Sequence, residues 1–180
     1  MRNPVRNVQR LVVKIGSNVL TTAQHKPNRV VIRQLVRDVI ILRERGVQVA
    51  IVTSGAVASG MGQLGLAQRP DSIAELQALA SIGQNLMMNS YKTLFGRSNV
   101  PIGQVLLTAE DILGDRKRYV NLENTFRSLF DYGAVPIINE NDSVAVTELK
   151  RQLGENDMLA AYVSNLIRAD LLVMMSDVEG

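Results

Sequence analysis

Five segments of this 180-residue sequence combine lysine, glycine, amide and carboxylate residues. Four follow short apolar runs, and one opens a predicted helix. They are residues 14–18 (Lys-Ile-Gly-Ser-Asn), 53–56 (Thr-Ser-Gly-Ala), 139–142 (Asn-Glu-Asn-Asp), 154–157 (Gly-Glu-Asn-Asp) and 176–177 (Ser-Asp). A lysine with glycine-freed N–H groups can hold a phosphate, while amides and carboxylates can hold an ammonium and a carboxylate. The set therefore favours a site for two polar ligands.

Lys14 is the most informative of these residues, because it interrupts the apolar run 11–15. A buried charge is costly unless it is paired. A phosphate beside Gly16 would pair it, since glycine lets the backbone approach and the ammonium balances the developing charge. A lysine that faces solvent on a half-covered strand explains the residue equally well, so both interpretations stay open on Lys14 alone.

Ser54 and Gly55 follow a second apolar run and precede small residues, as at an anion site on a helix N-terminus. A tight turn is the simpler explanation of this pair alone. Glu-Asn-Asp occurs twice, at 140–142 and 155–157. One triplet is typical of turns and caps, but two that flank the same excursion favour a binding function.

Other patterns are predicted to carry no chemistry. The G-x-G-x-x-G at 60–65 lies too far from a strand for a dinucleotide site. His25 is the one histidine and there is no cysteine, so no metal site is predicted. The methionines are expected to fill the core; they include Met87, Met88, Met158, Met174 and Met175.

Short β-branched runs alternate with helical spacing along the chain, which predicts an α/β fold. Strands are predicted at 11–15, 47–52, 101–107, 134–138 and 171–175, helices at 28–45, 71–97, 118–132 and 155–169, and a small hairpin at 144–153. This order implies right-handed crossovers and a mostly parallel sheet with helices on both faces. Ligands in such sheets bind at the carboxyl ends of the strands.

Composition excludes several classes of protein. The chain is 46% hydrophobic with a net charge of +3, which indicates one ordered domain. With 4% aromatic residues and no basic stripe, no nucleic-acid binding is expected. The longest apolar run falls short of the ~18 residues of a membrane span. Together with the absence of cysteine, this predicts a cytoplasmic protein.

The motifs at 13–17, 52–57, 103–108, 138–142 and 154–157 stand in the order and spacing of a known family. Over essentially the whole chain the sequence resembles the glutamate 5-kinases, a branch of the amino acid kinase family. The Lys-Ile-Gly-Ser motif is shared by many amino acid kinases. The paired Asn-Glu-Asn-Asp and Gly-Glu-Asn-Asp motifs are more specific to the glutamate branch.

The resemblance implies an αβα sandwich that transfers a phosphoryl group from ATP, with Mg²⁺, to the side-chain carboxylate of L-glutamate. The product would be L-glutamyl 5-phosphate, in the first step of proline biosynthesis. Positioning and charge stabilisation dominate phosphoryl transfer. The implied site residues are Lys14 and Asp157 for catalysis, Ser54, Gly55, Asn139, Asp142 and Asn156 for glutamate, and Lys14, Gly16, Ser17, Ser176 and Asp177 for the nucleotide.

The family's kinase domain continues beyond the motifs found here, with a second catalytic lysine and most of the adenine pocket, and many members add a PUA-type domain. We therefore expect residues 1–180 to be the substrate-binding portion of a truncated kinase domain, able to bind glutamate without full activity. The resemblance also implies L-proline as a feedback inhibitor and a homo-oligomer. The alternatives are a related carboxylate kinase and a non-catalytic module that binds glutamate or proline.

Overall fold

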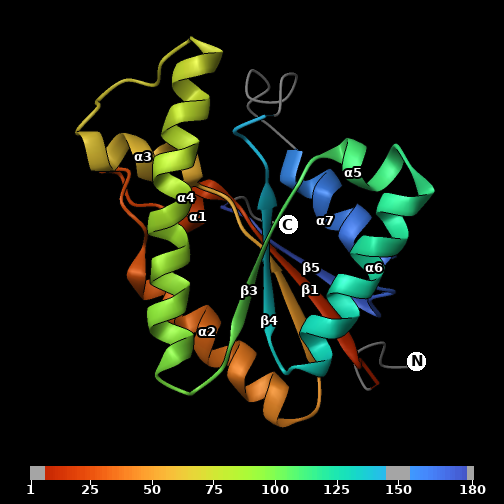
Figure 1. Ribbon diagram of the computed structural model, residues 1–180. Coiled ribbons are helices and arrows are strands. Elements are labelled where there is room, and N and C mark those ends of the chain that lie inside the picture. Colours follow the sequence, from red (N-terminus) through yellow and green to blue (C-terminus); the bar gives the residue numbers. More distant parts are fainter. Residues whose placement is uncertain (1–6, 145–154, 178–180) are drawn as a thin grey trace.

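The computed structural model describes residues 7–144 and 155–177, in which five parallel strands form one sheet in the order β3-β4-β2-β1-β5 (Figure 1). The strands are β1 (Arg10–Ile15), β2 (Gln48–Val52), β3 (Ile102–Leu107), β4 (Val135–Glu140) and β5 (Leu171–Met175). Their carboxyl ends lie at one edge of the sheet, which is where the sequence predicted the site.

Helices cover both faces of the sheet. They are α1 (Ser17–Leu20), α2 (Arg29–Glu44), α3 (Ala56–Leu64), α4 (Ile73–Gly96), α5 (Ala109–Leu113), α6 (Arg116–Asp131) and α7 (Glu155–Leu166). Figure 1 shows α2 and α4 on one face and α6 and α7 on the other. The αβα sandwich is thus confirmed, and the sheet is parallel throughout.

The two faces of β1 pack into different cores. Leu11, Val13 and Ile15 join the core beneath α2 and α4, whereas Val12 joins the core beneath α6 and α7. Side chains alternate across a strand, so Lys14 points to the same face as Val12. The lysine ammonium therefore lies on the α7 side of the sheet, near the carboxyl end of β1.

Strand β4 shows the same alternation and ends in two buried polar residues, Asn139 and Glu140. Val135 and Ile137 pack beneath α2 and α4, and Ile138 packs on the other face. Asn139 consequently faces α4. Lys14 and Asn139, each the last but one residue of its strand, thus lie on opposite faces of the sheet, and Glu140 lies on the face of Lys14.

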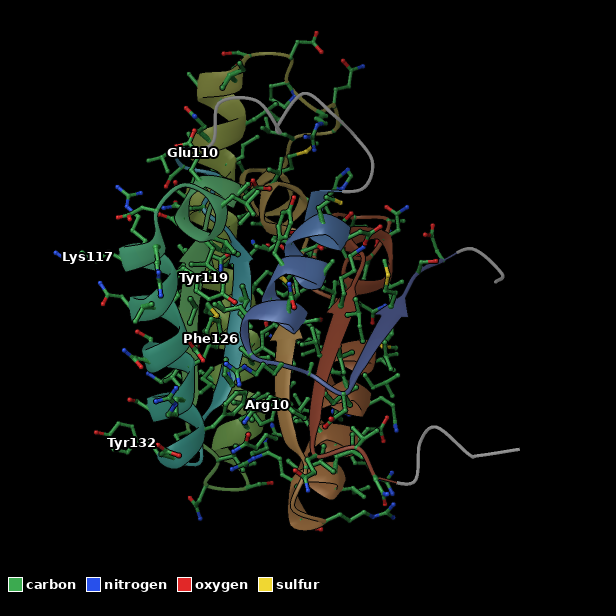
Figure 2. All side chains as sticks on the ribbon, turned by 90° about the vertical axis from the view of Figure 1, so that its right-hand side faces the viewer. Arg10, Glu110, Lys117, Tyr119, Phe126 and Tyr132 are labelled. Atoms are coloured by element: carbon green, nitrogen blue, oxygen red, sulfur yellow. The ribbon has the colours of Figure 1, made fainter. Side chains whose placement is uncertain are left out.

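On the α6 face, Figure 2 shows Tyr119 and Phe126 directed toward the sheet, while Lys117 and Tyr132 point outward. Phe126 is buried and Tyr132 is exposed. At the end of the sheet opposite the site, the Arg10 guanidinium lies 5.4 Å from the centroid of the Phe130 ring.

In residues 7–144 and 155–177, no helix has the length and apolar character that crossing a membrane requires.

Helices α3 and α4 touch through glycines. A Cβ added to Gly60 would lie 2.1 Å from the Leu79 carbonyl oxygen, and one added to Gly83 would lie 1.7 Å from that of Ala56. Gly60 and Gly62 belong to the G-x-G-x-x-G segment, and both lie inside α3. Close helix packing therefore accounts for Gly60, which agrees with the rejection of a dinucleotide motif.

The predicted strands and long helices are confirmed within a few residues, but three short helices, α1, α3 and α5, were not predicted. Strand β4 continues through Asn139 and Glu140 because these residues pair with Leu106 and Leu107. The predicted hairpin at 144–153 lies, apart from Val144, outside the described residues.

The expectation that the methionines fill the core is wrong for three of them. Met87 is fully buried, but Met158, Met174 and Met175 are 56%, 50% and 36% exposed. The last two lie on β5, which forms an edge of the described sheet. Only one side of an edge strand is paired, so apolar residues there are less covered.

Candidate active site

Lys14 and Asp157 form an ion pair at the carboxyl end of β1. Lys14 Nζ lies 2.5 Å from Asp157 Oδ1, with 12% of the lysine side chain and 39% of the aspartate side chain exposed. Asp157 stands in the first turn of α7, which packs on the face toward which Lys14 points. The pair satisfies a charge that would otherwise be costly in an apolar strand. Of the two interpretations of Lys14, a lysine that simply faces solvent is excluded.

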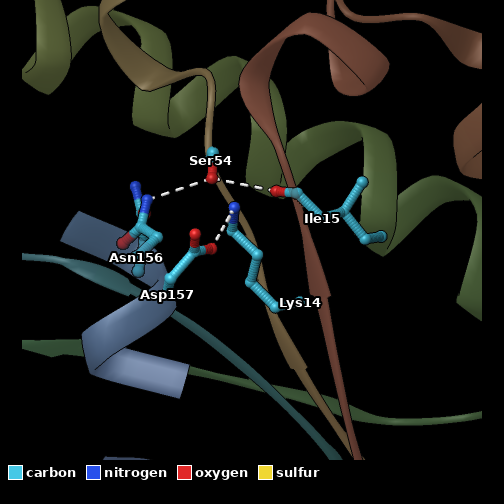
Figure 3. A network of polar contacts seen from close by, with 6 residues as sticks. Lys14, Ile15, Ser54, Asn156 and Asp157 are labelled. Carbon is cyan, nitrogen blue, oxygen red and sulfur yellow. Dashed lines mark hydrogen bonds and ion pairs between the residues drawn. The ribbon is translucent and has the colours of Figure 1, made fainter. Parts of the chain in front are cut away.

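Ser54 joins three elements beside this pair (Figure 3). Its Oγ donates to the Ile15 carbonyl oxygen at 2.9 Å and accepts from Asn156 Nδ2 at 3.0 Å. Ser54 follows β2, Ile15 ends β1, and Asn156 begins α7. The serine thus fixes the start of α7 over the sheet edge.

A second set of amide contacts continues from Asn156 into the sheet. Asn156 Nδ2 also approaches Asn139 Oδ1 at 3.4 Å, and Asn139 Nδ2 donates to Gln84 Oε1 at 2.8 Å. Asn139 is 2% exposed and Gln84 is 9% exposed. We call Ser54, Gln84, Asn139 and Asn156 the amide network.

Two polar atoms of the amide network have no hydrogen-bond partner among the described residues. They are Asn156 Oδ1 and Gln84 Nε2, and both are buried. Buried polar atoms are nearly always paired in folded proteins, because an unpaired one retains its desolvation cost. The network is therefore complementary to a ligand that brings both a donor and an acceptor.

The backbone beneath the network is held firmly. Gly55 caps α3 with φ of +89°, and an added Cβ would lie 3.0 Å from a methyl carbon of Thr21. Thr53 Oγ1 and the Tyr91 hydroxyl are 3.1 Å apart in the core. Burial raises the pKa of Tyr91 to about 12, against the opposing hydrogen bond from Thr53. Tyr91 therefore stays neutral and supports the end of β2.

Asp142 lies in the turn after β4 and is partly buried. Burial raises the pKa of its carboxyl from 3.8 to about 6, although the charge of Arg69 acts in the opposite direction. A carboxylate with this shift would gain from a cationic ligand, which favours its charged form. Among the described residues, no hydrogen bond or ion pair joins Asp142 directly to the amide network.

The residues predicted for the nucleotide lie on the other side of Lys14. Ser17, Ser176 and Asp177 are exposed. Asn18 Nδ2 donates to Asp177 Oδ2 at 2.9 Å, and this bond is the main cause that lowers the pKa of Asp177. A Cβ at Gly16 would lie 3.9 Å from Lys14 Nζ, so the glycine leaves room beside the ammonium.

The structure thus brings Lys14, Ser54, Asn139, Asn156 and Asp157 together, with Gly55 alongside. Asp142 makes none of these hydrogen bonds. Ser17, Ser176 and Asp177 are exposed, and the half-buried Gly16 lies beside Lys14 Nζ. Gln84 was not predicted, and Asn18 was named only as part of the segment 14–18, without a role. Gln84 could have been recognised from its place on the buried stripe of α4, at the three- and four-residue spacing of Leu76, Ala80, Met87 and Tyr91.

Comparison with known proteins identifies the class. The sequence profile described as "Amino acid kinase family" matches residues 9–180. The chain belongs to the amino acid kinase family, and the parallel α/β sandwich is consistent with that fold.

Within this family, the chain is similar to proteins named glutamate 5-kinase. The chain is 46% identical over 176 residues to "Glutamate 5-kinase" of Clostridium tetani, covering 98% of this chain and 65% of that protein. It is 47% and 48% identical to the proteins of the same name from Carboxydothermus hydrogenoformans and Pseudomonas entomophila, covering all of this chain and 48% of each. The chain therefore spans about half to two thirds of the length of these relatives.

Proposed function

We propose that this chain is the substrate-binding portion of a glutamate 5-kinase, which phosphorylates the side-chain carboxylate of L-glutamate with ATP in the first step of proline biosynthesis. The observation that carries the proposal is the Lys14–Asp157 pair beside an amide network with an unpaired buried donor and acceptor. The similarity to glutamate 5-kinases supports it.

In this proposal the amino acid lies over the carboxyl ends of β1, β2 and β4. Ser54, Asn139 and Asn156 orient it, and the Asp142 carboxylate attracts its ammonium. Its side-chain carboxylate is directed toward Lys14. No general base is required, because that carboxylate is already ionised at neutral pH.

Lys14 has the role of balancing negative charge on the transferring phosphoryl group. Asp157 holds the ammonium in place and is a positioning residue. Phosphoryl transfer depends mainly on such positioning and charge stabilisation. A lysine already fixed by an ion pair needs little rearrangement when charge develops.

ATP is the proposed co-substrate, held by Gly16, Ser17, Ser176 and Asp177. Gly16 lies next to the Lys14 ammonium, since a Cβ added there would be 3.9 Å from Nζ, and its backbone can approach a phosphate without a side chain in the way. Mg²⁺ bound to a nucleotide usually takes one or two carboxylates and keeps several waters. Asp177, ionised and oriented by Asn18, suits that role. Residues 7–144 and 155–177 contain no group of three or more potential metal ligands.

Binding and turnover are tested separately. We expect L-glutamate to raise the melting temperature of the 180-residue chain, because a ligand that prefers the folded state stabilises it. Phosphoryl transfer is proposed for the whole protein and is measured there as L-glutamate-dependent ADP release. Absence of glutamate binding to the chain would contradict the proposal. If the whole protein binds L-glutamate without turnover, the alternative of a non-catalytic module is favoured. If a substrate panel shows that it prefers another acid, a related carboxylate kinase is favoured.

Inhibition by L-proline, a homo-oligomer and a cytoplasmic location are further parts of the proposal that rest on the resemblance. Titration with L-proline in the same melting experiment and sedimentation of the purified protein measure the first two.

A further inference from the structure

Gln84 has a position that packing alone does not explain. It lies on the buried stripe of α4 and is 9% exposed. Its Oε1 accepts from Asn139 Nδ2 at 2.8 Å, while its Nε2 is buried without a hydrogen-bond partner among the described residues. A glutamine at such a position is costly unless both ends of its amide are used.

The amide network has a consistent direction. Asn156 directs its NH₂ group toward the oxygen of Asn139, and Asn139 donates its NH₂ group to the oxygen of Gln84. Reversing the Gln84 amide would set two NH₂ groups against each other, so the hydrogen bonds fix its orientation. An acceptor, Asn156 Oδ1, is therefore free at one end and a donor, Gln84 Nε2, at the other.

A zwitterionic amino acid matches these two ends. Its ammonium can donate to Asn156 Oδ1, and a carboxylate can accept from Gln84 Nε2. The order of the residues along the network indicates which carboxylate of glutamate accepts from Gln84 Nε2. Asp157, the partner of Lys14, directly follows Asn156 in the chain, whereas Asn139 separates Gln84 from Asn156. Gln84 is thus at the end of the network farther from Lys14.

We infer that Gln84 is a specificity-determining residue whose Nε2 donates to the α-carboxylate of the bound amino acid. The identity of the ligand as L-glutamate rests on the proposed function above. Through this bond the site selects α-amino acids over acids that carry only the side-chain carboxylate. The reacting carboxylate remains at Lys14.

The Gln84→Glu variant tests this role most directly. It keeps an oxygen that accepts from Asn139 and replaces the free NH₂ with a second oxygen, which cannot donate when ionised and repels a carboxylate. We expect the Kd for L-glutamate, measured by calorimetry on the full chain, to rise about 10- to 100-fold, as for the loss of a hydrogen bond to a charged group. Asn85→Asp is the matched control, since it makes the same charge change on the exposed side of α4.

A second ligand separates substrate binding from a merely structural role. 4-Aminobutanoate is L-glutamate without the α-carboxylate. If Gln84 binds that carboxylate, Gln84→Glu reduces the preference for L-glutamate over 4-aminobutanoate. If Gln84 only supports Asn139, both ligands lose affinity equally or not at all, and the inference is overturned.

A measurement on the unmutated chain covers the case in which the variant does not fold. On addition of L-glutamate, the assigned side-chain NH₂ signals of Gln84 in ¹⁵N NMR should shift downfield, as expected for donation to a carboxylate, and 4-aminobutanoate should leave them nearly unchanged. Unchanged signals under saturating L-glutamate contradict the inference and leave the proposed function intact. Failure of the unmutated chain to bind L-glutamate contradicts the proposed function itself.

Discussion

The two sides of Lys14 are built differently. On the side proposed for the amino acid, Ser54, Asn139 and Gln84 are 7%, 2% and 9% exposed. Hydrogen bonds through Asn156 connect them, and the bonded residues belong to β1, β4, α4 and α7 or follow β2. On the side proposed for the nucleotide, Ser17 and Asp177 are exposed, and a hydrogen bond from Asn18 to Asp177 links the segments after β1 and β5.

This difference shows which part of the site is organised before any ligand arrives. Buried, mutually bonded amides cannot rotate freely, so a ligand that matches them pays little ordering entropy. Exposed side chains keep their freedom and must be ordered on binding. We therefore expect changes on the amino-acid side to affect both stability and affinity, and changes on the nucleotide side to affect affinity for ATP with little effect on stability.

Lys14→Met should have the largest effect, because Lys14 lies between the two sides. In the whole protein we expect kcat to fall by about 10²- to 10³-fold, as when one preorganised charge-stabilising donor is removed. The Kd for L-glutamate should also rise, because Lys14 faces the side-chain carboxylate, but by less than kcat falls, since Ser54 and Asn156 remain in place. Kinetics and calorimetry measure the two effects, and Lys117→Met, on exposed α6, is the control. A kcat that stays at the wild-type value would remove Lys14 from the mechanism.

Asp142→Asn tests the side proposed for the amino acid, through the pH dependence of stability and of L-glutamate binding. The folded-state pKa of about 6 exceeds the reference value of 3.8, so folding takes up a proton between these values. The contribution of Asp142 to the free energy of unfolding is therefore largest below about pH 4 and is lost as pH rises through about 6, by at most about 3 kcal/mol. The variant should lack this slope and gain stability relative to the wild type at pH 7.

Urea unfolding at pH 4.5 and 7.5 measures the slope, with the exposed Asp71→Asn as control. Equal slopes in Asp142→Asn and the wild type would contradict the prediction. Calorimetry adds a test of function. If the Asp142 carboxylate attracts the substrate ammonium, wild-type affinity for L-glutamate should rise as pH passes about 6, and the variant should lose that rise.

Two glycine substitutions give the smallest effects and compare the sides directly. In Gly83→Ala the new Cβ meets the Ala56 carbonyl oxygen at 1.7 Å beside Gln84, and we expect a loss of about 1–3 kcal/mol together with weaker glutamate binding. In Gly16→Ala the nearest atoms are 3.6 and 3.9 Å away, so stability should change by less than about 0.5 kcal/mol. Urea unfolding measures the free energy of unfolding of both variants. An equal loss of stability in the two would contradict the difference between the two sides of Lys14.

The sequence was sufficient to predict the strands, the long helices and most of the residues that meet at the sheet edge. Apolar spacing determines these elements, and parallel strands necessarily bring their carboxyl ends together. Lys14 could be recognised because it interrupts an apolar run. Its partner Asp157 was assigned from the family resemblance, and the described ion pair now gives that assignment a geometry.

The rest depended on long-range packing that no local pattern encodes. Gln84 is separated by 55 positions from Asn139, and Asn156 by 102 positions from Ser54. The short helices α1, α3 and α5 lack the length that makes a periodic pattern visible. Asn18 pairs with Asp177 only because β5 lies beside β1, a neighbour relation set by the whole topology.

The alternation along β1 and β4 places Lys14 against the α7 layer and Asn139 against the α4 layer. An amino acid bound to both ends of the network would therefore act as a cross-link between two layers that otherwise communicate through the sheet. In hydrogen-exchange terms, amides of α4 and of the first turn of α7 should gain protection together when the ligand binds, while α6, which carries none of these contacts, should exchange as before.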